Sequence, residues 1–232
     1  MQLRSTTASL VAVAAVTALL VSACGGGDGG EEKGSGKGGG IEGAKDGSSR
    51  SPGRDGGSDE AASGDFRISD IELPKDLKLV FDWEKPGDPE KAAALDGAAD
   101  YMRALMHGTV QQDAKDPEIV KHTVPLQSAR EYGFSTVGRD VEDKYSVTGE
   151  ERYYREKVGD LVDGKLRQVT FCSNQSKLFS KELDTGKVRR TKPSDEDYLR
   201  FTLVMQKPGK SGGVWKAHSF ELEEKAVEQC EP

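Results

Sequence analysis

Hydrophobic and polar positions divide the chain into three segments. An apolar run extends from Ala8 to Val21, and a stretch almost without apolar side chains follows from Gly25 to Asp65. From Phe66 onward, apolar residues recur at regular intervals between charged ones. The middle segment cannot bury enough apolar surface to offset the entropy of ordering a chain. The pattern therefore predicts one folded domain, residues 66–232, preceded by a disordered linker, residues 24–65.

The first part of the folded domain has helical periodicity. Asp88 and Pro89 are typical of a helix start, because Asp can accept hydrogen bonds from the first amides and Pro suits the first turn. The helix is expected to end at His107 and Gly108. Its apolar face is formed by Leu95, Ala98, Met102, Leu105 and Met106.

Two shorter helices are expected to follow. Asp116 and Pro117 repeat the same capping pattern and predict a helix that runs toward His122. A third helical piece is expected from Pro125 toward Tyr132. Before the first helix, residues 66–73 and 77–83 are expected to be extended segments that lead into the domain.

After Val147 the period becomes that of β-strands. From Tyr198 to Gln206 apolar and other residues alternate, so one side of this strand is expected to face the core. Turn residues at 162–164 predict a hairpin of strands 152–161 and 165–172, and those at 184–186 predict a hairpin of strands 177–183 and 187–191. A last strand is expected over residues 214–223. Helices followed by hairpin-connected strands predict an α+β fold, in which N-terminal helices pack on a strongly bent antiparallel sheet.

The first 23 residues are typical of an export signal. Arg4 gives a positive start, the apolar run is shorter than the ~20 residues that span a bilayer, and small residues precede Cys24. The stretch Leu20-Val-Ser-Ala-Cys24 resembles the bacterial lipobox. That resemblance implies a lipoprotein signal peptide at 1–23 and acylation of Cys24, with two acyl chains sufficient for stable membrane anchoring. The alternative is a plain signal peptide with a chance cysteine.

Charge and cysteine content narrow the function further. The chain carries 33 Lys and Arg against 40 Asp and Glu, a net charge of −7, which argues against a nucleic-acid partner. Besides Cys24, the cysteines are Cys172 and Cys230. In an exported protein they are expected to form a disulfide. Two unrelated free thiols remain the alternative.

The order of the elements is similar to that of the nuclear transport factor 2-like (cystatin-like) cone. More narrowly, the chain resembles uncharacterised lipoproteins of actinobacteria of the Streptomyces type. The resemblance is carried by Asp88-Pro89, Asp116-Pro117, Thr170 to Ser176, Val214-Trp-Lys216 and Cys230. It implies a cone-shaped domain and a disulfide from Cys172 to the C-terminal cysteine. It implies no biochemical role.

No catalytic, cofactor or metal site can be read from the residues. His107 and His122 sit near expected helix ends, where a cation complements the helix dipole. His218 lies on the last strand with no partner at a recognisable spacing, and Tyr101 is expected at the edge of the core rather than as an acid. Paired metal ligands and the Gly-x-Ser-x-Gly nucleophile motif are absent from the sequence.

The sequence therefore favours a lipoprotein held at the extracytoplasmic face of the cell membrane, in a Gram-positive bacterium, by a lipid anchor at Cys24. Its domain is expected to be a non-enzymatic binding module for an envelope protein or wall ligand. A small hydrolase or isomerase that uses the cone pocket is the alternative. The basic run from Lys187 to Lys192 is expected to be a solvated hairpin edge rather than a polyanion site, because acidic residues follow it directly.

Overall fold

The structure is a computed structural model that describes residues 69–231. The expected signal peptide, Cys24 and the linker lie outside these residues, so the interpretation of the N-terminal segment stays a prediction. Within residues 69–231, no helix is both long enough and apolar enough to cross a membrane.

Three helices follow a first short strand, and the capping signals predict the first two of them. Helix α1 runs over Pro89–Gln111, α2 over Pro117–His122 and α3 over Ser128–Glu142. The Asp88 side chain accepts hydrogen bonds from two amides of the first turn of α1, and Asp116 does the same for one amide of α2. Both sequence signals therefore act as expected.

Two helices have bounds that differ from the prediction. Helix α1 continues past His107 and Gly108 to Gln111, because Gln112 takes the left-handed backbone conformation that closes the helix. Gly108 instead lets α2 approach, since a Cβ at this position would lie 3.1 Å from the side chain of Ile119. Helix α3 starts later and is longer than the predicted piece from Pro125 to Tyr132.

In the described part of the chain, six strands form one sheet with the order β1-β2-β3-β5-β6, and the short strand β4 pairs with β3. The strands are β1 Leu77–Phe81, β2 Tyr145–Val158, β3 Leu166–Glu182, β4 Val188–Arg189, β5 Tyr198–Gln206 and β6 Lys216–Glu223. A 3₁₀ turn, η1 (Asp195–Asp197), leads into β5. The strand predicted over residues 198–206 is confirmed, with every second residue buried.

The sheet differs from the prediction in two respects. It is mixed, because β1 pairs with β2 in parallel while the other pairs are antiparallel. The three helices connect β1 to β2, and such a crossover is what joins parallel strands. In addition, the two predicted strands over residues 165–172 and 177–183 form one continuous strand, β3.

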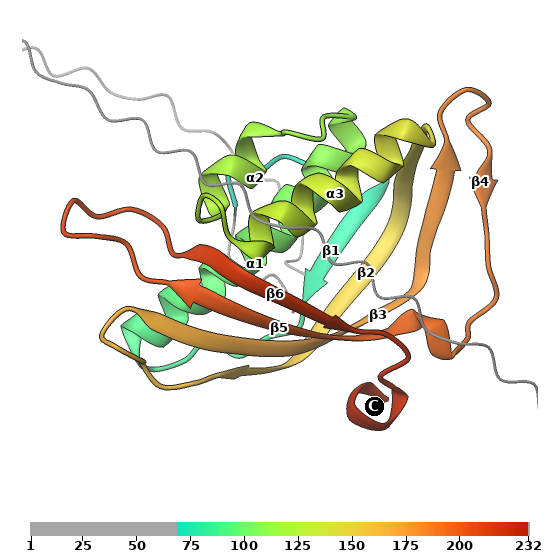
Figure 1. Ribbon diagram of the computed structural model, residues 1–232. Coiled ribbons are helices and arrows are strands. Elements are labelled where there is room, and N and C mark those ends of the chain that lie inside the picture. The colour runs from blue at the N-terminus through green and yellow to red at the C-terminus, as the bar shows by residue number, and fades with distance from the viewer. Residues whose placement is uncertain (1–68, 232) are drawn as a thin grey trace, which may run out of the picture. The chain divides into compact units, whose positions relative to one another are not determined.

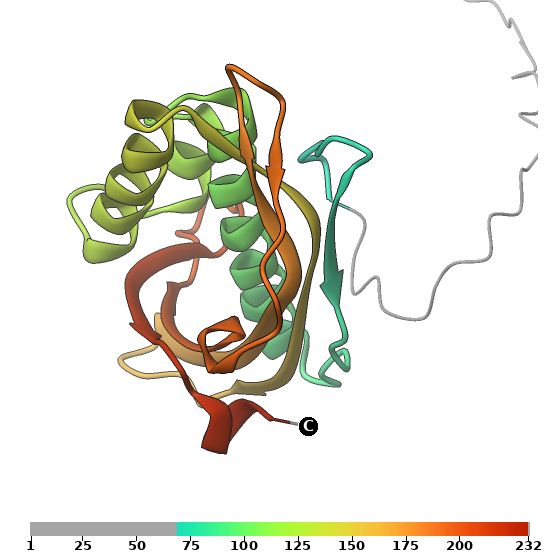
Figure 2. The same cartoon turned by 90° about the vertical axis from the view of Figure 1, so that its right-hand side faces the viewer.

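The sheet curves strongly and carries helices α1, α2 and α3 on one side (Figure 1). Viewed from the side, it curls around α1, and α3 lies across the opening (Figure 2). The core lies between the helices and the concave inner face of the sheet. Its largest fully buried side chains are Tyr101, Tyr153, Phe81, Phe171, Leu95, Ile119, Leu203 and Met205.

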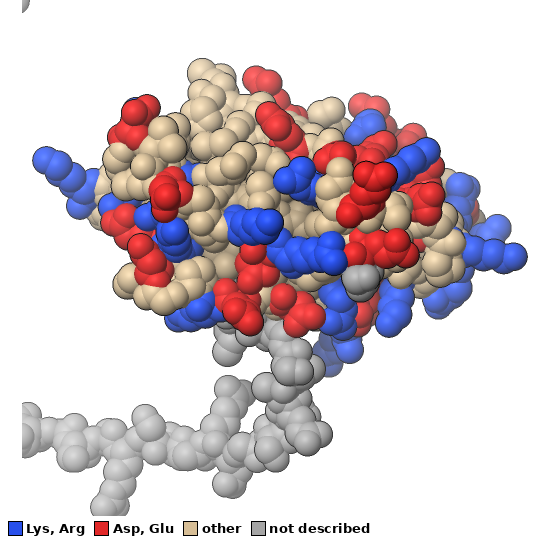
Figure 3. Space-filling model, turned by 90° about the horizontal axis from the view of Figure 1, so that it is seen from below, with Lys and Arg blue, Asp and Glu red and all other residues tan. Residues whose placement is uncertain are grey.

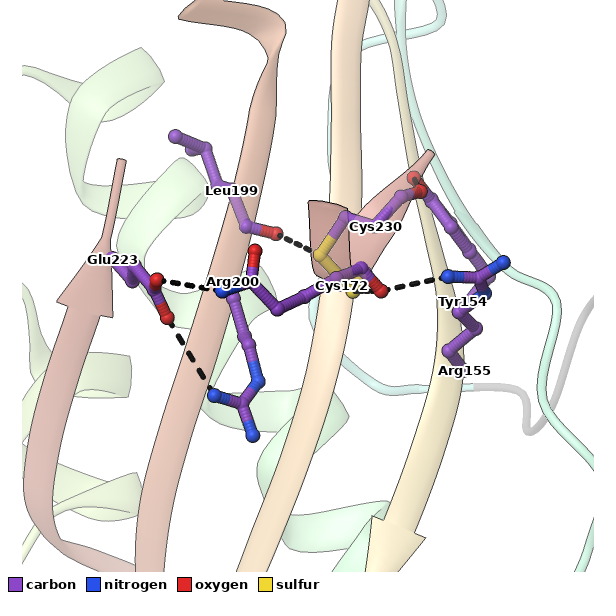
Figure 4. The surroundings of a disulfide bond; sticks show 8 residues. Tyr154, Arg155, Cys172, Leu199, Arg200, Glu223 and Cys230 are labelled. Carbon is purple, nitrogen blue, oxygen red and sulfur yellow. Dashed lines mark hydrogen bonds and ion pairs between the residues drawn. A yellow bond between two sulfur atoms is a disulfide. The ribbon is translucent and has the colours of Figure 1, made fainter. Parts of the chain in front are cut away.

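A disulfide fastens the C-terminus to the opposite, outer face. Cys172 of β3 is bonded to Cys230 of the short helix α4 (Val227–Cys230), and their Cα atoms lie 5.5 Å apart. Figure 4 shows the bond between strands β3 and β5, with Tyr154 and Arg155 of β2 alongside. The side chains of Tyr154, Tyr198 and Ala226 pack around it. The predicted pairing of these two cysteines is present in the structure.

Charges are mixed over the surface. In the view from below, Lys and Arg side chains are interspersed with Asp and Glu (Figure 3). Two cations of the expected basic edge have partners: Arg189 forms an ion pair with Glu182 at 2.7 Å, and the Arg190 guanidinium lies over the ring of Phe179. This arrangement agrees with a solvated hairpin edge.

Candidate functional site

The inside of the curved sheet contains a small cavity, which we call the cone cavity. Its volume is about 130 Å³, and it lies between α1, α3 and the concave face of the sheet. The lining includes Met102, Met106, Tyr132, Asp140, Glu151 and Phe220. Sites for drug-sized ligands usually have volumes of about 300–1,000 Å³. The cone is therefore mostly filled by its own side chains.

Aromatic side chains do most of this filling. Phe171 and Phe201 stack with ring centroids 5.1 Å apart, and Phe220 follows at 5.7 Å from Phe201. Tyr132 of α3 stacks on Phe220 at 4.0 Å and brings the chain of ring contacts to the helices. Offset and edge-on ring contacts of this kind contribute about 0.5–1.5 kcal/mol each beyond their burial.

Glu151 is the one acidic side chain of the cone cavity that is fully buried, among the residues described. Gln175 Nε2 donates a hydrogen bond to Glu151 Oε1 at 2.8 Å, whereas Oε2 accepts none within residues 69–231. Burial raises the pKa of the Glu151 carboxyl. The hydroxyls of Tyr153 and Ser173 lie near the Glu151 carboxyl but do not reach hydrogen-bond geometry. They lower the pKa of Glu151 by less than burial raises it.

A β-bulge in the β2–β3 pair places Glu151 and Gln175 together. The register passes from Glu150 opposite Lys177 to Arg152 opposite Asn174, so β3 has one extra residue at this point. A bulge bends the strand and redirects side chains, and bulges are frequent beside functional sites. Here the extra residue lets the long Gln175 side chain reach the buried carboxyl.

A second carboxyl lies at the helical wall of the cone cavity. Asp140 of α3 accepts a hydrogen bond from Thr109 Oγ1 at 2.8 Å, and burial raises its pKa. Burial also raises the pKa of Tyr132. The cavity thus combines apolar walls with two acids whose neutral forms are favoured by their surroundings.

The histidines are not gathered into a site. His107 Nδ1 lies 2.8 Å from Asp116 Oδ2, which ties α1 to the cap of α2. His122 is buried in the last turn of α2, as expected, and burial lowers its pKa. His218 is half-buried on β6 and does not line the cone cavity.

Tyr101 has a structural position, as the sequence suggests. Its side chain is fully buried, and its hydroxyl donates a hydrogen bond to the Ala129 carbonyl at 2.8 Å. This bond links α1 to the start of α3. Within residues 69–231, no group of three or more His, Cys, Asp or Glu side chains could hold a metal ion.

The convex side of the same strands carries a hollow lined mainly by polar and charged residues, which we call the outer groove. Its volume is about 310 Å³, within the range of small-molecule sites. The lining residues are Asp82, Glu150, Arg152, Tyr154, Asn174, Ser176 and Lys177. Glu150, Arg152 and Tyr154 alternate with the buried Glu151 and Tyr153 along β2, so they point to the opposite face.

Sequence reasoning missed both the buried acid and the outer groove. The sequence does indicate that one of Tyr153 and Tyr154 is buried, and the structure shows that it is Tyr153. Glu151 and Tyr153 are two residues apart on a strand, so their side chains point to the same face. This spacing was the sequence signal for a carboxyl that points inward. The bulge at Gln175 has no comparable signal, because nothing in the local sequence marks it.

Comparison with known proteins finds similarity to solved structures alone. No family model matches the chain, and no curated protein matches it. Similar solved structures include a ketosteroid isomerase-like protein from Erwinia carotovora, with 13% identity, 59% of this chain and 97% of that chain covered, and a TM-score of 0.40.

Two further solved structures have similarly low sequence identities and TM-scores. A candidate ketosteroid isomerase from Shewanella frigidimarina has 14% identity over 56% of this chain and 94% of that chain, with a TM-score of 0.31. A protein from Catenulispora acidiphila has 17% identity over 57% of this chain and 89% of that chain, with a TM-score of 0.34. At these values the comparison assigns neither an activity nor a ligand to this chain.

Proposed function

We propose that this chain is a membrane-anchored extracytoplasmic lipoprotein, of the actinobacterial type, whose nuclear transport factor 2-like cone domain is a non-enzymatic binding module. The filled cone is the observation that supports a non-enzymatic binding module. Phe171, Phe201 and Phe220 occupy the space where an open pocket would need to be, and about 130 Å³ remains. A ligand of ordinary size must therefore bind elsewhere on the domain.

The disulfide supports an extracytoplasmic location. Disulfides form and persist in oxidising compartments and are rare in the cytosol. Cys172 and Cys230 are bonded in the structure, and Cys230 is fully buried. Together with the lipobox-like stretch that ends at Cys24, this favours an exported chain held at the membrane surface.

Anchoring is tested by expressing the chain and its Cys24→Ala variant in a Gram-positive host with a labelled fatty acid. The parent should carry the label and remain with the membrane fraction. Cys24→Ala should lose the label and be released or left unprocessed, while Cys172→Ala is the matched cysteine control and should keep the label. Equal labelling of the Cys24→Ala variant would contradict the anchor.

The filled cone is tested with a fluorescent apolar probe such as anilinonaphthalene sulfonate. The folded chain should give no saturable fluorescence increase at neutral pH, because the cone cavity is too small for the probe. Met106→Trp, which adds volume at the cavity wall, should leave this result unchanged. Saturable binding by the parent that Met106→Trp abolishes would show an open cone and overturn the proposal.

One observation favours an alternative, a small isomerase or hydrolase that uses the cone. Glu151 and Asp140 both line the cone cavity, and burial raises the pKa of both carboxyls. A buried acid with a free oxygen is a usual general acid or base. This reading requires the aromatic residues to move apart, and probe binding that is lost on cavity filling would support it.

A further inference from the structure

The outer groove is a preformed hollow rather than a flat strand surface. The bulge in β3 brings both Ser176 and Lys177, which are consecutive residues, to its lining, together with Asn174. On a regular strand, Ser176 and Lys177 would point to opposite faces. The same bulge therefore builds one site on each face: it directs Gln175 to the buried acid inside and opens the groove outside.

Tyr154 forms an anchored aromatic wall at one end of this groove. Its hydroxyl donates a hydrogen bond to the Cys230 carbonyl, and its cross-strand partner in β3 is Cys172. Both anchor points thus belong to the disulfide. A ring that is held in place before binding loses little conformational entropy when a ligand stacks on it.

The polar side chains of the groove offer donors and acceptors in balance. Arg152 Nη1 lies 3.2 Å from Asp82 Oδ2, and Arg152 Nη2 lies 3.8 Å from Glu150 Oε1. Asn174 Oδ1 accepts a hydrogen bond from the Ser176 amide, and the two N–H donors of its side chain have no partner within residues 69–231. Lys177 has no ion-pair partner within residues 69–231. Two acidic and two basic side chains give the lining no net charge.

From this combination we propose that the outer groove binds an uncharged saccharide. Each hydroxyl group of a sugar both donates and accepts hydrogen bonds, so it matches carboxylates, an amide and cationic donors at once. The apolar face of a sugar ring can lie against Tyr154. A lining without net charge gives no electrostatic preference for an anion or a cation. The inference deepens the proposed binding function and rests on it.

The test measures binding by the full chain that carries Cys24→Ala, so that lipid anchoring plays no part. The probes are tri-N-acetylchitotriose, cellotriose and maltotriose, with tri-galacturonic acid as the charged comparison, in isothermal titration. At least one uncharged trisaccharide should bind. Tyr154→Ala should weaken that binding about tenfold, which is the loss expected for a central aromatic contact.

Tyr198→Ala is the matched control. Tyr198 packs in the same disulfide cluster as Tyr154 but does not line the groove. It should destabilise the domain to a similar degree and leave trisaccharide affinity unchanged. Asn174→Ala should weaken binding about fivefold without affecting the disulfide cluster.

Three outcomes would overturn the inference. They are no binding of any uncharged trisaccharide by the folded chain, tighter binding of tri-galacturonic acid, and equal loss with Tyr154→Ala and Tyr198→Ala. None of these results bears on Cys24 labelling or on apolar-probe binding, so a failure of the ligand class is distinguishable from a failure of the proposed function.

Discussion

The two faces of strand β2 place nearly identical side chains in opposite surroundings. Glu151 and Tyr153 point into the cone and are fully buried, whereas Glu150 and Tyr154 point outward and are partly exposed. Inside, the carboxyl has one hydrogen-bond donor and aromatic neighbours. Outside, the carboxyl faces an arginine beside an open hollow. Neighbouring residues of the same type thus have different physical roles.

The comparison indicates a division of work between the faces. The inner face supplies packing, and its buried acid is a cost that the fold tolerates. Apart from the disulfide cluster, the outer face contributes little to packing and presents polar groups that can exchange water for a ligand. We therefore expect inner substitutions to change stability and outer substitutions to change binding.

The largest effect is expected from truncating an inner aromatic residue. Tyr153→Ala should lower the free energy of unfolding by about 3–5 kcal/mol, because it leaves a cavity among Phe81, Phe171 and Phe201. Urea denaturation followed by tryptophan fluorescence measures this change. Tyr154→Ala, at the outward-facing neighbour of Tyr153, should lower the free energy of unfolding clearly less. Equal losses for the two variants would remove the distinction between the faces.

Removing the disulfide should have the next largest effect. The bond links positions 58 residues apart, and loops of this size give about 4 kcal/mol by chain entropy, with 2–4 kcal/mol typical. The double variant Cys172→Ala/Cys230→Ala should therefore unfold at clearly lower urea concentration. It should also weaken trisaccharide binding, since Tyr154 loses its anchor. A variant with parental stability would show that the bond is not formed in the protein.

The buried acid should make stability depend on pH. The folded-state pKa of Glu151 is raised, so the folded chain holds this proton more tightly than the unfolded chain. Stability from this group is present below the unfolded pKa of about 4.3 and is lost as pH rises through the folded value. Glu151→Gln should therefore gain stability relative to the parent over this window, by at most about 1.4 kcal/mol per pH unit.

Glu150→Gln is the control for this measurement, made by urea titration at several pH values. On the outer face it should change stability by less than about 0.5 kcal/mol. If the stability difference between Glu151→Gln and the parent were constant over the whole pH range, the account of the buried carboxyl would be wrong.

A small stability effect is also expected at the centre of the outer groove. Arg152→Ala removes side-chain ion pairs with Asp82 and Glu150 in which all partners are partly exposed, and such pairs contribute about 0–1 kcal/mol. Thermal unfolding should shift little, whereas trisaccharide affinity should fall. A large loss of stability would assign Arg152 to the fold rather than to binding.

Local signals in the sequence predicted much of this fold. Asp88 and Asp116 cap their helices because capping depends on adjacent residues alone, and the alternation from Tyr198 to Gln206 marks a strand with one buried face. Strand direction was not predictable, since the pairing of β1 with β2 joins segments separated by three helices. The local pattern is the same for a parallel and an antiparallel neighbour.

The candidate sites were harder to predict for a related reason. The bulge opposite Glu151 arises where two strands, each regular by itself, pair with unequal numbers of residues. Neither strand shows this in its own sequence. The outer groove combines residues of β2 and β3 with Asp82, which follows β1, so it exists only once the sheet has formed.

The most direct test of the account maps where a ligand binds. Amide chemical shifts of the folded, isotope-labelled chain would be followed while tri-N-acetylchitotriose, cellotriose or maltotriose is added. The account predicts that shifts concentrate at residues 150, 152, 154 and 174–177, with little change at Met102, Met106 and Asp140. Shifts concentrated at the cone cavity, with the outer groove unaffected, would contradict it.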